Sequence, residues 1–130
     1  MSGTKRKTVL LVEDEPDLSS TIKMVLERYK YVVHSFSDPF LALKHIKEDG
    51  CKDCKIVLSD IKMPQMTGVE LAVHLKRIRP SLKIVLMSAM PVDREDWRNV
   101  LPKSENVDDF ISKPFSTDQL VQLMKKLERK

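Results

Sequence analysis

The sequence predicts an α/β fold, a parallel five-stranded sheet with helices on both faces. Short apolar runs alternate with amphipathic segments five times along the 130 residues, a pattern that favours parallel strands joined by right-handed crossovers. The third run, Ile56–Asp60, is apolar until it stops at a carboxylate, as expected of a strand buried on both faces. Polar residues follow four of the five strands, and such sheets bind ligands at the carboxyl ends of their strands.

Length and composition fit one domain, residues 1–130 with a core of about 7–127. Charged residues make up 32% of the chain and hydrophobic residues 42%, which is ordinary for a globular protein. The sequence has no apolar run long enough for a membrane span and no signal-peptide pattern, so we expect a cytoplasmic protein without membrane contact. The net charge of +4 comes largely from basic ends that we expect to be solvated tails.

The first half of the chain predicts three strands and two helices. The strands are expected at Thr8–Val12, Val32–Phe36 and Ile56–Asp60. Pro16 opens the first helix, where its missing N–H does no harm, and Asp38 caps the second, which Gly50 ends. The apolar faces recur at helical spacing. They comprise Leu18, Ile22, Val25, Leu26 and Tyr29 in the first helix and Ala42, Leu43 and Ile46 in the second.

The second half predicts two strands and two capped helices. Thr67 with Glu70, and Ser116 with Gln119, each have the spacing of a capping box. The strands are expected at Lys83–Met87, ending at Ser88, and at Asp109–Ser112. The predicted buried faces are Leu71, Leu75 and Ile78 in the third helix and Leu120, Leu123 and Leu127 in the last, with Phe115 packing on Leu120. The segment from Pro91 to Asn106 is the least regular, with a short helix indicated around Trp97 and interrupted by Pro102.

Side chains that can bind a metal ion or react lie at the carboxyl ends of four predicted strands: Glu13 and Asp14, Asp60, Ser88 and Lys113. Two carboxylates about 4 Å apart repel by about 4 kcal/mol at an effective dielectric near 20, so either one acid is protonated or a cation lies among them. Oxygen ligands without imidazole or thiolate suit Mg²⁺. An aspartate beside a metal and a lysine can accept a phosphoryl group. The alternative, that Glu13 and Asp14 only cap the helix at Pro16, leaves the other residues unexplained.

Cys51 and Cys54 form a C-x-x-C in a polar loop before the third strand. A redox pair is expected at a helix N-terminus, and a zinc site needs four ligands, of which only His45 is near in sequence. We therefore expect two free thiols. The three histidines, His34, His45 and His74, are expected on the surface or on helix faces, outside the acidic pocket.

Four strings resemble the receiver domain of two-component response regulators: V-L-L-V-E-D-E from Val9, D-I-K-M-P-Q-M-T-G from Asp60, M-S-A from Met87 and D-F-I-S-K-P-F from Asp109. The resemblance covers the chain from about Lys7 to Leu127. It implies a single flavodoxin-like (βα)5 domain with strand order 2-1-3-4-5, an order for which chemotaxis-type receivers are themselves the standard example.

By this resemblance Asp60 is the phosphoacceptor, charged by a sensor histidine kinase or phosphotransfer protein. Glu13, Asp14 and Asp60, with the backbone carbonyl of Lys62, would hold Mg²⁺. Lys113 would pair with the phosphoryl group, and the Lys113–Pro114 bond would be cis, a geometry nearly confined to X-Pro.

The resemblance also implies a switch. Ser88 would move toward the phosphate and Phe110 would turn inward, which changes the face made by the fourth helix, fifth strand and fifth helix and so the binding of a downstream protein. Phe110 is equally well read as a core aromatic that never moves. Lys62 and Met90 occupy positions that tune phosphate loss in the family, and the segment before the fifth strand is longer than usual.

We expect a phosphorylation-controlled binding module that catalyses only its own phosphoryl transfer and contacts no nucleic acid itself. Whether it forms a homodimer, and whether it works alone or as part of a longer regulator, is left open. One alternative is a Mg²⁺-dependent aspartate-nucleophile phosphohydrolase, which would usually need an acid where Lys62 stands. The other is a pseudo-receiver that binds partners without phosphate.

Overall fold

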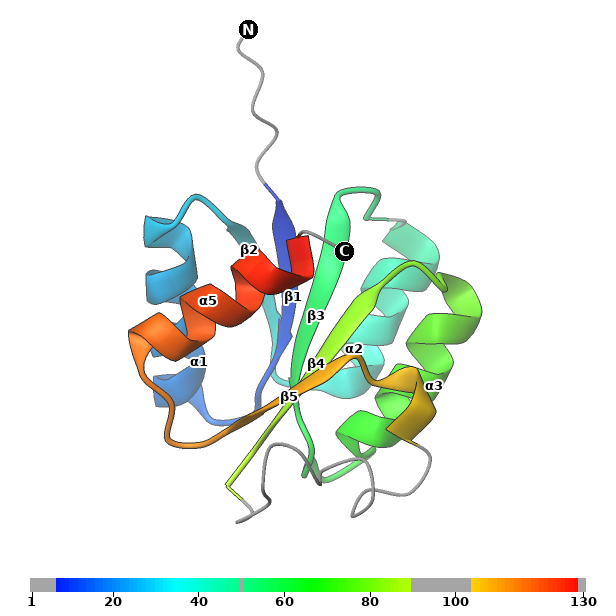
Figure 1. Ribbon diagram of the computed structural model, residues 1–130. Coiled ribbons are helices and arrows are strands. Elements are labelled where there is room, and N and C mark those ends of the chain that lie inside the picture. The colour runs from blue at the N-terminus through cyan, green and yellow to red at the C-terminus, as the bar shows by residue number, and fades with distance from the viewer. Residues whose placement is uncertain (1–6, 50, 90–103, 129–130) are drawn as a thin grey trace, which may run out of the picture.

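The protein forms one parallel sheet. The computed structural model describes residues 7–49, 51–89 and 104–128, and within them the strand order is β2-β1-β3-β4-β5 with every neighbouring pair parallel. The strands are β1 (Thr8–Val12), β2 (Val32–Phe36), β3 (Cys54–Asp60), β4 (Lys83–Ser88) and β5 (Asp109–Ser112). The predicted fold class and strand order are confirmed (Figure 1).

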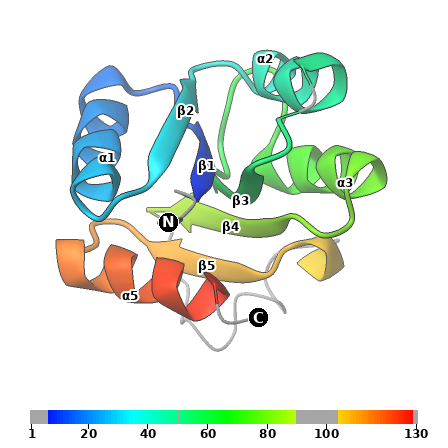
Figure 2. The same cartoon turned by 90° about the horizontal axis from the view of Figure 1, so that it is seen from above.

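Helices cover both faces of the sheet. Helices α1 (Pro16–Arg28) and α5 (Thr117–Glu128) lie on one face, and α2 (Pro39–Lys44) and α3 (Gly68–Ile78) on the other, as Figure 2 shows from above. A π-helical turn, η1 (His45–Asp49), continues α2, and a 3₁₀ turn, η2 (Ser104–Asn106), precedes β5. The expected short helix around Trp97 lies outside the described residues.

The core has two halves, one on each side of the sheet. Successive side chains of a strand point to opposite faces, and β1 shows this in full. Leu10 and Val12 pack in the cluster under α2 and α3, whereas Val9 and Leu11 pack in the cluster under α1 and α5. Each of these four side chains is 0% exposed, which explains why the strand reads as an unbroken apolar run.

The helix caps follow the sequence signals. The Thr67 hydroxyl accepts the backbone N–H of Glu70, and the Glu70 carboxylate accepts that of Thr67. Ser116 and Gln119 exchange the same pair of hydrogen bonds at the start of α5. Both predicted capping boxes are therefore confirmed. Phe115 packs against the cluster that contains Leu120.

Three local expectations were wrong. The central strand begins at Cys54 rather than Ile56, because Cys54 pairs with Thr8 of β1 and is buried. Tyr29 and Ile78, expected on buried helix faces, are 44% and 40% exposed. Tyr29 is the C-cap of α1 and Ile78 the last residue of α3, so each sits where the chain is already turning away from the sheet.

Candidate functional site

The register of the sheet brings four strand ends together at one edge. Val12 pairs with Ser59, Asp60 with Met87, and Ser88 with Ser112. The residues that follow β1 and β5 are therefore level with the end of β3. Glu13, Asp14, Asp60, Ser88 and Lys113 all lie at this edge, as the sequence predicted.

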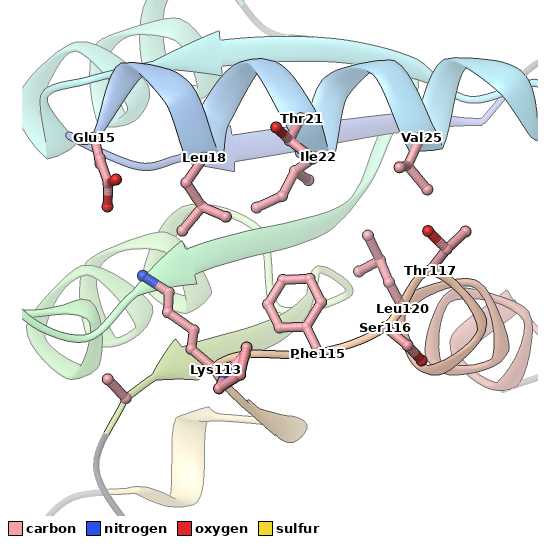
Figure 3. A pocket seen from close by; sticks show the side chains of 12 residues that line it. Glu15, Leu18, Thr21, Ile22, Val25, Lys113, Phe115, Ser116, Thr117 and Leu120 are labelled. Carbon is pink, nitrogen blue, oxygen red and sulfur yellow. The ribbon is translucent and has the colours of Figure 1, made fainter.

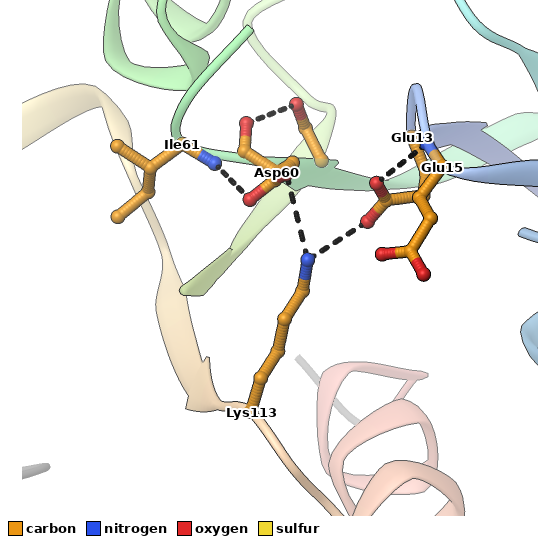
Figure 4. A network of polar contacts seen from close by, with 6 residues as sticks. Glu13, Glu15, Asp60, Ile61 and Lys113 are labelled. Carbon is orange, nitrogen blue, oxygen red and sulfur yellow. Dashed lines mark hydrogen bonds and ion pairs between the residues drawn. The ribbon is translucent and has the colours of Figure 1, made fainter. Parts of the chain in front are cut away.

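Lys113 joins two of the acids. Its ammonium Nζ lies 2.9 Å from Glu13 Oε1 and 3.4 Å from Asp60 Oδ2 (Figure 4). Burial alone would lower the pKa of Lys113, but the hydrogen bond to Glu13 and the negative charge of Asp60 outweigh burial and raise the pKa. The lysine is therefore a fixed positive charge. The peptide bond that follows it, Lys113–Pro114, is cis as predicted.

Glu13 is the buried acid of the site, with a side chain only 1% exposed. One carboxylate oxygen accepts from the Lys113 ammonium, and the other accepts the backbone N–H of Glu15 at 3.1 Å. Burial raises the pKa of Glu13, and these two hydrogen bonds offset the effect only in part. A carboxylate in this position gains from any further positive charge beside it.

Asp60 is more accessible and is oriented by the backbone. Its Oδ1 accepts the N–H of Ile61 at 2.9 Å, which leaves Oδ2 directed toward Lys113 (Figure 4). The side chain is 15% exposed. Asp60 is thus held in one orientation and can still be reached from solvent.

Gly68 fixes the loop that follows Asp60, a role that the sequence reasoning missed. Its N–H donates to the carbonyl of Ile61 at 2.8 Å. A Cβ at this position would overlap the backbone oxygen of Asp60 and come within 2.8 Å of Leu86 Cδ2. Only glycine fits this contact without a shift. The available signal was a glycine directly after the capping residue Thr67.

Three carboxylates form an oxygen-only cluster. Glu13, Asp14 and Asp60 each offer an oxygen atom, and these atoms lie within 4.8 Å of one another. Asp14 is exposed, Asp60 half-buried and Glu13 buried, so the cluster opens to water on one side. Lys113 neutralises one of the three charges. The remaining charge and the hard oxygen donors fit a divalent ion that keeps some water ligands, the preference of Mg²⁺.

A cavity of about 300 Å³ lies beside Asp60 and is lined by Asp60, Lys62, Ser88, Ala89 and Lys113. It brings together a carboxylate, an ammonium and a hydroxyl around a space large enough for a phosphoryl group. Lys62 is exposed and is one of the residues that line this cavity. Met90, the other residue expected to tune the site, lies outside the described residues.

Phe110 is 0% exposed and belongs to the core cluster on the α2–α3 face. The side chain thus occupies an inward position in this structure. Both readings of Phe110, a switch aromatic and a static core residue, remain predictions, because each includes this inward position.

An apolar groove of about 350 Å³ runs between α1 and α5 and ends at Lys113 (Figure 3). Leu18, Ile22 and Val25 line it from α1, and Phe115 and Leu120 from the opposite side. The groove adjoins the acidic cluster through Lys113 and Glu15. A partner bound there would be next to the carboxylates.

The expectation of two free thiols was wrong. Cys51 and Cys54 form a disulfide with their Cα atoms 5.5 Å apart, within the range that a disulfide can bridge. The two residues come close because the chain turns between them, with the N–H of Cys54 donating to the carbonyl of Cys51 at 3.3 Å. His74 is exposed on α3, but His34 and His45 are in mutual contact, with Nδ1 and Nε2 2.8 Å apart.

The family model described as "Response regulator receiver domain" matches residues 9–125. The chain is 32% identical over 126 residues to the C4-dicarboxylate transport transcriptional regulatory protein DctD of Rhizobium meliloti, covering 95% of this chain and 25% of that protein. It is 31% identical to the response regulator receiver protein CpdR of Brucella abortus, covering 93% of this chain and 96% of CpdR. The chain spans only a quarter of DctD and half of the response regulator RppA of Synechocystis.

Solved structures agree in fold. The chemotaxis protein CheY4 of Vibrio cholerae superimposes with a TM-score of 0.79 at 20% identity, over 95% of this chain and 99% of that one. The response regulator protein TrrA of Thermotoga maritima, in complex with Mg(2+)-BeF, gives a TM-score of 0.78 at 27% identity, over 93% and 98%.

The chain belongs to the response regulator receiver family and is a receiver domain of two-component systems. It is a signalling domain, and the comparisons do not favour the phosphohydrolase or the pseudo-receiver. Receiver domains bind Mg²⁺ at the acidic pocket and interact with sensor kinases and downstream effectors. In the part of the chain that the structure describes, no helix has the length and apolar character to cross a membrane.

Proposed function

We propose that Asp60 is the phosphoacceptor and takes its phosphoryl group from the phosphohistidine of a sensor histidine kinase or a phosphotransfer protein. The observation that supports this most directly is the sharing of the Lys113 ammonium between Glu13 and Asp60 at the mouth of a cavity that Ser88 also lines. The two proteins would meet in the cytoplasm.

The transfer needs little from the protein beyond positioning and charge. A carboxylate oxygen of Asp60 forms a bond to phosphorus while the bond from phosphorus to the donor imidazole breaks, and the imidazole keeps the electron pair. Lys113 then exchanges its contact with Asp60 for a phosphoryl oxygen, and the Ser88 hydroxyl donates to another. The same residues would assist hydrolysis of the aspartyl phosphate, so the domain turns over no external metabolite.

Glu13, Asp14 and Asp60, with the backbone carbonyl of Lys62, would hold Mg²⁺. The ion would supply charge neutralisation on the phosphoryl oxygens. Glu13 would serve as a metal ligand because its carboxylate is held at the site by hydrogen bonds from the Lys113 ammonium and the Glu15 N–H. Lys62 would also shield the phosphoryl group from water with its exposed side chain.

Phosphorylation would change the face formed by the fourth helix, β5 and α5, which a downstream protein recognises. Ser88 would move toward the phosphoryl group and Phe110 would settle in the space that Ser88 vacates, a bias on two existing states. A downstream protein would bind the changed face. Of this face the structure describes β5 and α5, while the expected fourth helix lies outside the described residues.

The phosphodonor protein would dock on the groove between α1 and α5. This groove is apolar, lies beside Lys113, and is lined by Leu18 and Phe115 (Figure 3). Leu18→Lys would therefore slow transfer from the kinase but not from a small phosphodonor. Exposed Met24 on the same helix, changed to Lys, provides the matched control because it does not line the groove.

The test of the proposed function uses acetyl phosphate with Mg²⁺. The wild-type protein should acquire one alkali-labile phosphoryl group, and Asp60→Asn should acquire none. Steady turnover of phosphoesters would instead favour the phosphohydrolase, and the lack of any label in the wild type would favour the pseudo-receiver.

A further inference from the structure

A second cluster of potential ligands lies far from the acidic site. His34 on β2, His45 at the start of η1, Cys51 in the following loop and Cys54 at the start of β3 each offer one ligand atom, and these four atoms lie within 4.8 Å of one another. Cys54 and Asp60 are at opposite ends of β3. Six steps along a strand span roughly 20 Å, so this cluster is separate from the site of phosphorylation.

The cluster is held in place by contacts of its own. His34 Nδ1 lies 2.8 Å from His45 Nε2 and 4.0 Å from Cys51 Sγ. Arg79 donates from Nη1 to the backbone carbonyls of both cysteines, at 2.5 Å to Cys51 and 3.1 Å to Cys54. His45 begins a π-helical turn, a rare conformation that is frequently found at functional sites. These contacts, together with the Cys51–Cys54 disulfide, hold the four side chains close to one another.

We propose that His34, His45, Cys51 and Cys54 form a binding site for one Zn²⁺ ion when the two cysteines are reduced. Two sulfurs from a C-x-x-C and two imidazole nitrogens are a standard tetrahedral zinc donor set. From the usual Zn–N and Zn–S bond lengths, such a site separates its nitrogens by about 3.3 Å and a nitrogen from a sulfur by about 3.5 Å. The observed N···N distance of 2.8 Å and N···S distance of 4.0 Å are close enough to these values that small side-chain rotations would reach them.

The alternative interpretation is that the disulfide is purely structural and only happens to lie beside a histidine pair. A disulfide stabilises mainly by closing a loop, and the stabilisation grows with the length of that loop. Cys51 and Cys54 are separated by three positions, so this disulfide closes a very short loop and stabilises the fold little. A disulfide beside a histidine pair also does not require the four ligand atoms to gather within 4.8 Å of one another, as they do here.

Metal binding requires reduction first. A dithiol reductant attacks one sulfur of the disulfide, the S–S bond breaks, and a second attack releases the oxidised reductant as its own disulfide. The domain gains two electrons and two protons as two thiols. Zn²⁺ then binds as both thiol protons pass to solvent, because the thiolate is the ligand. The site is thus available only to the reduced protein.

The experiment uses the full chain, treated with a phosphine reductant and freed of metal, and titrated with Co²⁺ as a probe and then with Zn²⁺. The expected result is one tetrahedral Co²⁺ per chain with a thiolate-to-metal charge-transfer band, which Zn²⁺ abolishes by displacement. The disulfide form should show no such band. Binding of Co²⁺ at the acidic cluster would give no thiolate band, so the two sites are distinguished.

Single variants separate a site from chance proximity. His34→Ala, His45→Ala and Cys54→Ser should each weaken Zn²⁺ affinity by about 100-fold or more, since loss of an outer-shell partner alone costs 10–100-fold. Arg79→Gln, which removes such a partner, should cost about 10-fold. His74→Ala is the matched control and should bind like wild type. Far-ultraviolet circular dichroism verifies that each variant is folded.

Three outcomes would overturn the proposal: no thiolate band in the reduced wild type, a band that persists without His34 and His45, or equal Zn²⁺ affinity in the disulfide and reduced forms. Labelling by acetyl phosphate is a separate readout. It should be unchanged in His34→Ala, so a failure of the zinc site would not affect the phosphoacceptor proposal.

Discussion

Lys113 and Glu13 form an ion pair at 2.9 Å although they are 100 positions apart in the sequence. The pair connects the residue that follows β5 with the residue that follows β1, and Asp60 of β3 also contacts the Lys113 ammonium. Because the Glu13 side chain is almost fully buried, Lys113 stabilises the fold as well as serving the site. Its loss would leave a buried carboxylate without a counter-charge.

The first prediction concerns this pair. Lys113→Gln should lower the free energy of unfolding by on the order of 2 kcal/mol, because the buried Glu13 carboxylate would then have no positive charge to compensate it. In a Glu13→Gln background the same change should cost much less. Urea unfolding of the two single variants and the double variant measures the coupling. An equal cost in both backgrounds would show that the pair does not matter for stability.

The second prediction concerns the metal. Mg²⁺ should raise the melting temperature of the wild type because it binds the folded state only. Asp14→Asn removes one ligand, and a tenfold weaker affinity reduces the stabilisation by about 1.4 kcal/mol at high Mg²⁺. Asp118→Asn, an exposed acid in the first turn of α5, is the control and should respond like wild type. An undiminished response of Asp14→Asn would remove Asp14 from the ligand set.

The third prediction concerns the loop after Asp60. Gly68→Ala would force the new Cβ against the Asp60 carbonyl, and such overpacking typically costs about 1–3 kcal/mol. The displaced loop should also slow labelling by acetyl phosphate. Thr67→Ala removes only the helix cap, at about 1 kcal/mol, and should leave the labelling rate unchanged. Equal labelling rates in the two variants would contradict the positioning role of Gly68.

The fourth prediction concerns alkaline pH. Burial raises the pKa of the Tyr31 phenol, and the neighbouring Glu128 carboxylate adds to the effect. The folded state therefore keeps the phenolic proton at a pH where the unfolded state, with a pKa near 10, releases it. This stability is complete below about pH 10 and is lost as pH rises above it, by up to about 1.4 kcal/mol per pH unit.

Tyr31→Phe should remove this part of the pH dependence of the unfolding free energy. Tyr29→Phe, which changes an exposed ring, serves as the control and should keep the wild-type slope. If wild type and Tyr31→Phe lose stability in parallel above pH 10, the buried phenol does not contribute.

Much of the acidic site could be predicted from the sequence because its signals are local. Each functional side chain follows directly on an apolar run, and parallel strands bring such positions to one edge. The cis bond before Pro114 was expected only from the resemblance to receiver domains. The capping boxes depend on neighbouring residues alone. These features required no knowledge of which segments pack together.

Features that depend on contact between distant segments could not be predicted. The contact of His34 with His45 joins a strand to a helical turn, and nothing in the spacing of the two residues indicates it. Whether Cys51 and Cys54 could bond depended on the turn between them. The role of Gly68 depends on the closeness of the Asp60 carbonyl, which only the folded loop reveals.

The most direct test of the central claim is to map the phosphorylated residue. The protein is treated with acetyl phosphate and Mg²⁺, then with borohydride, which reduces an aspartyl phosphate to homoserine, and its peptides are sequenced by mass spectrometry. We expect homoserine at position 60, and only when the phosphodonor was present. Homoserine derived from Asp14 or any other acid, or none at all, would contradict the assignment of Asp60 as the phosphoacceptor.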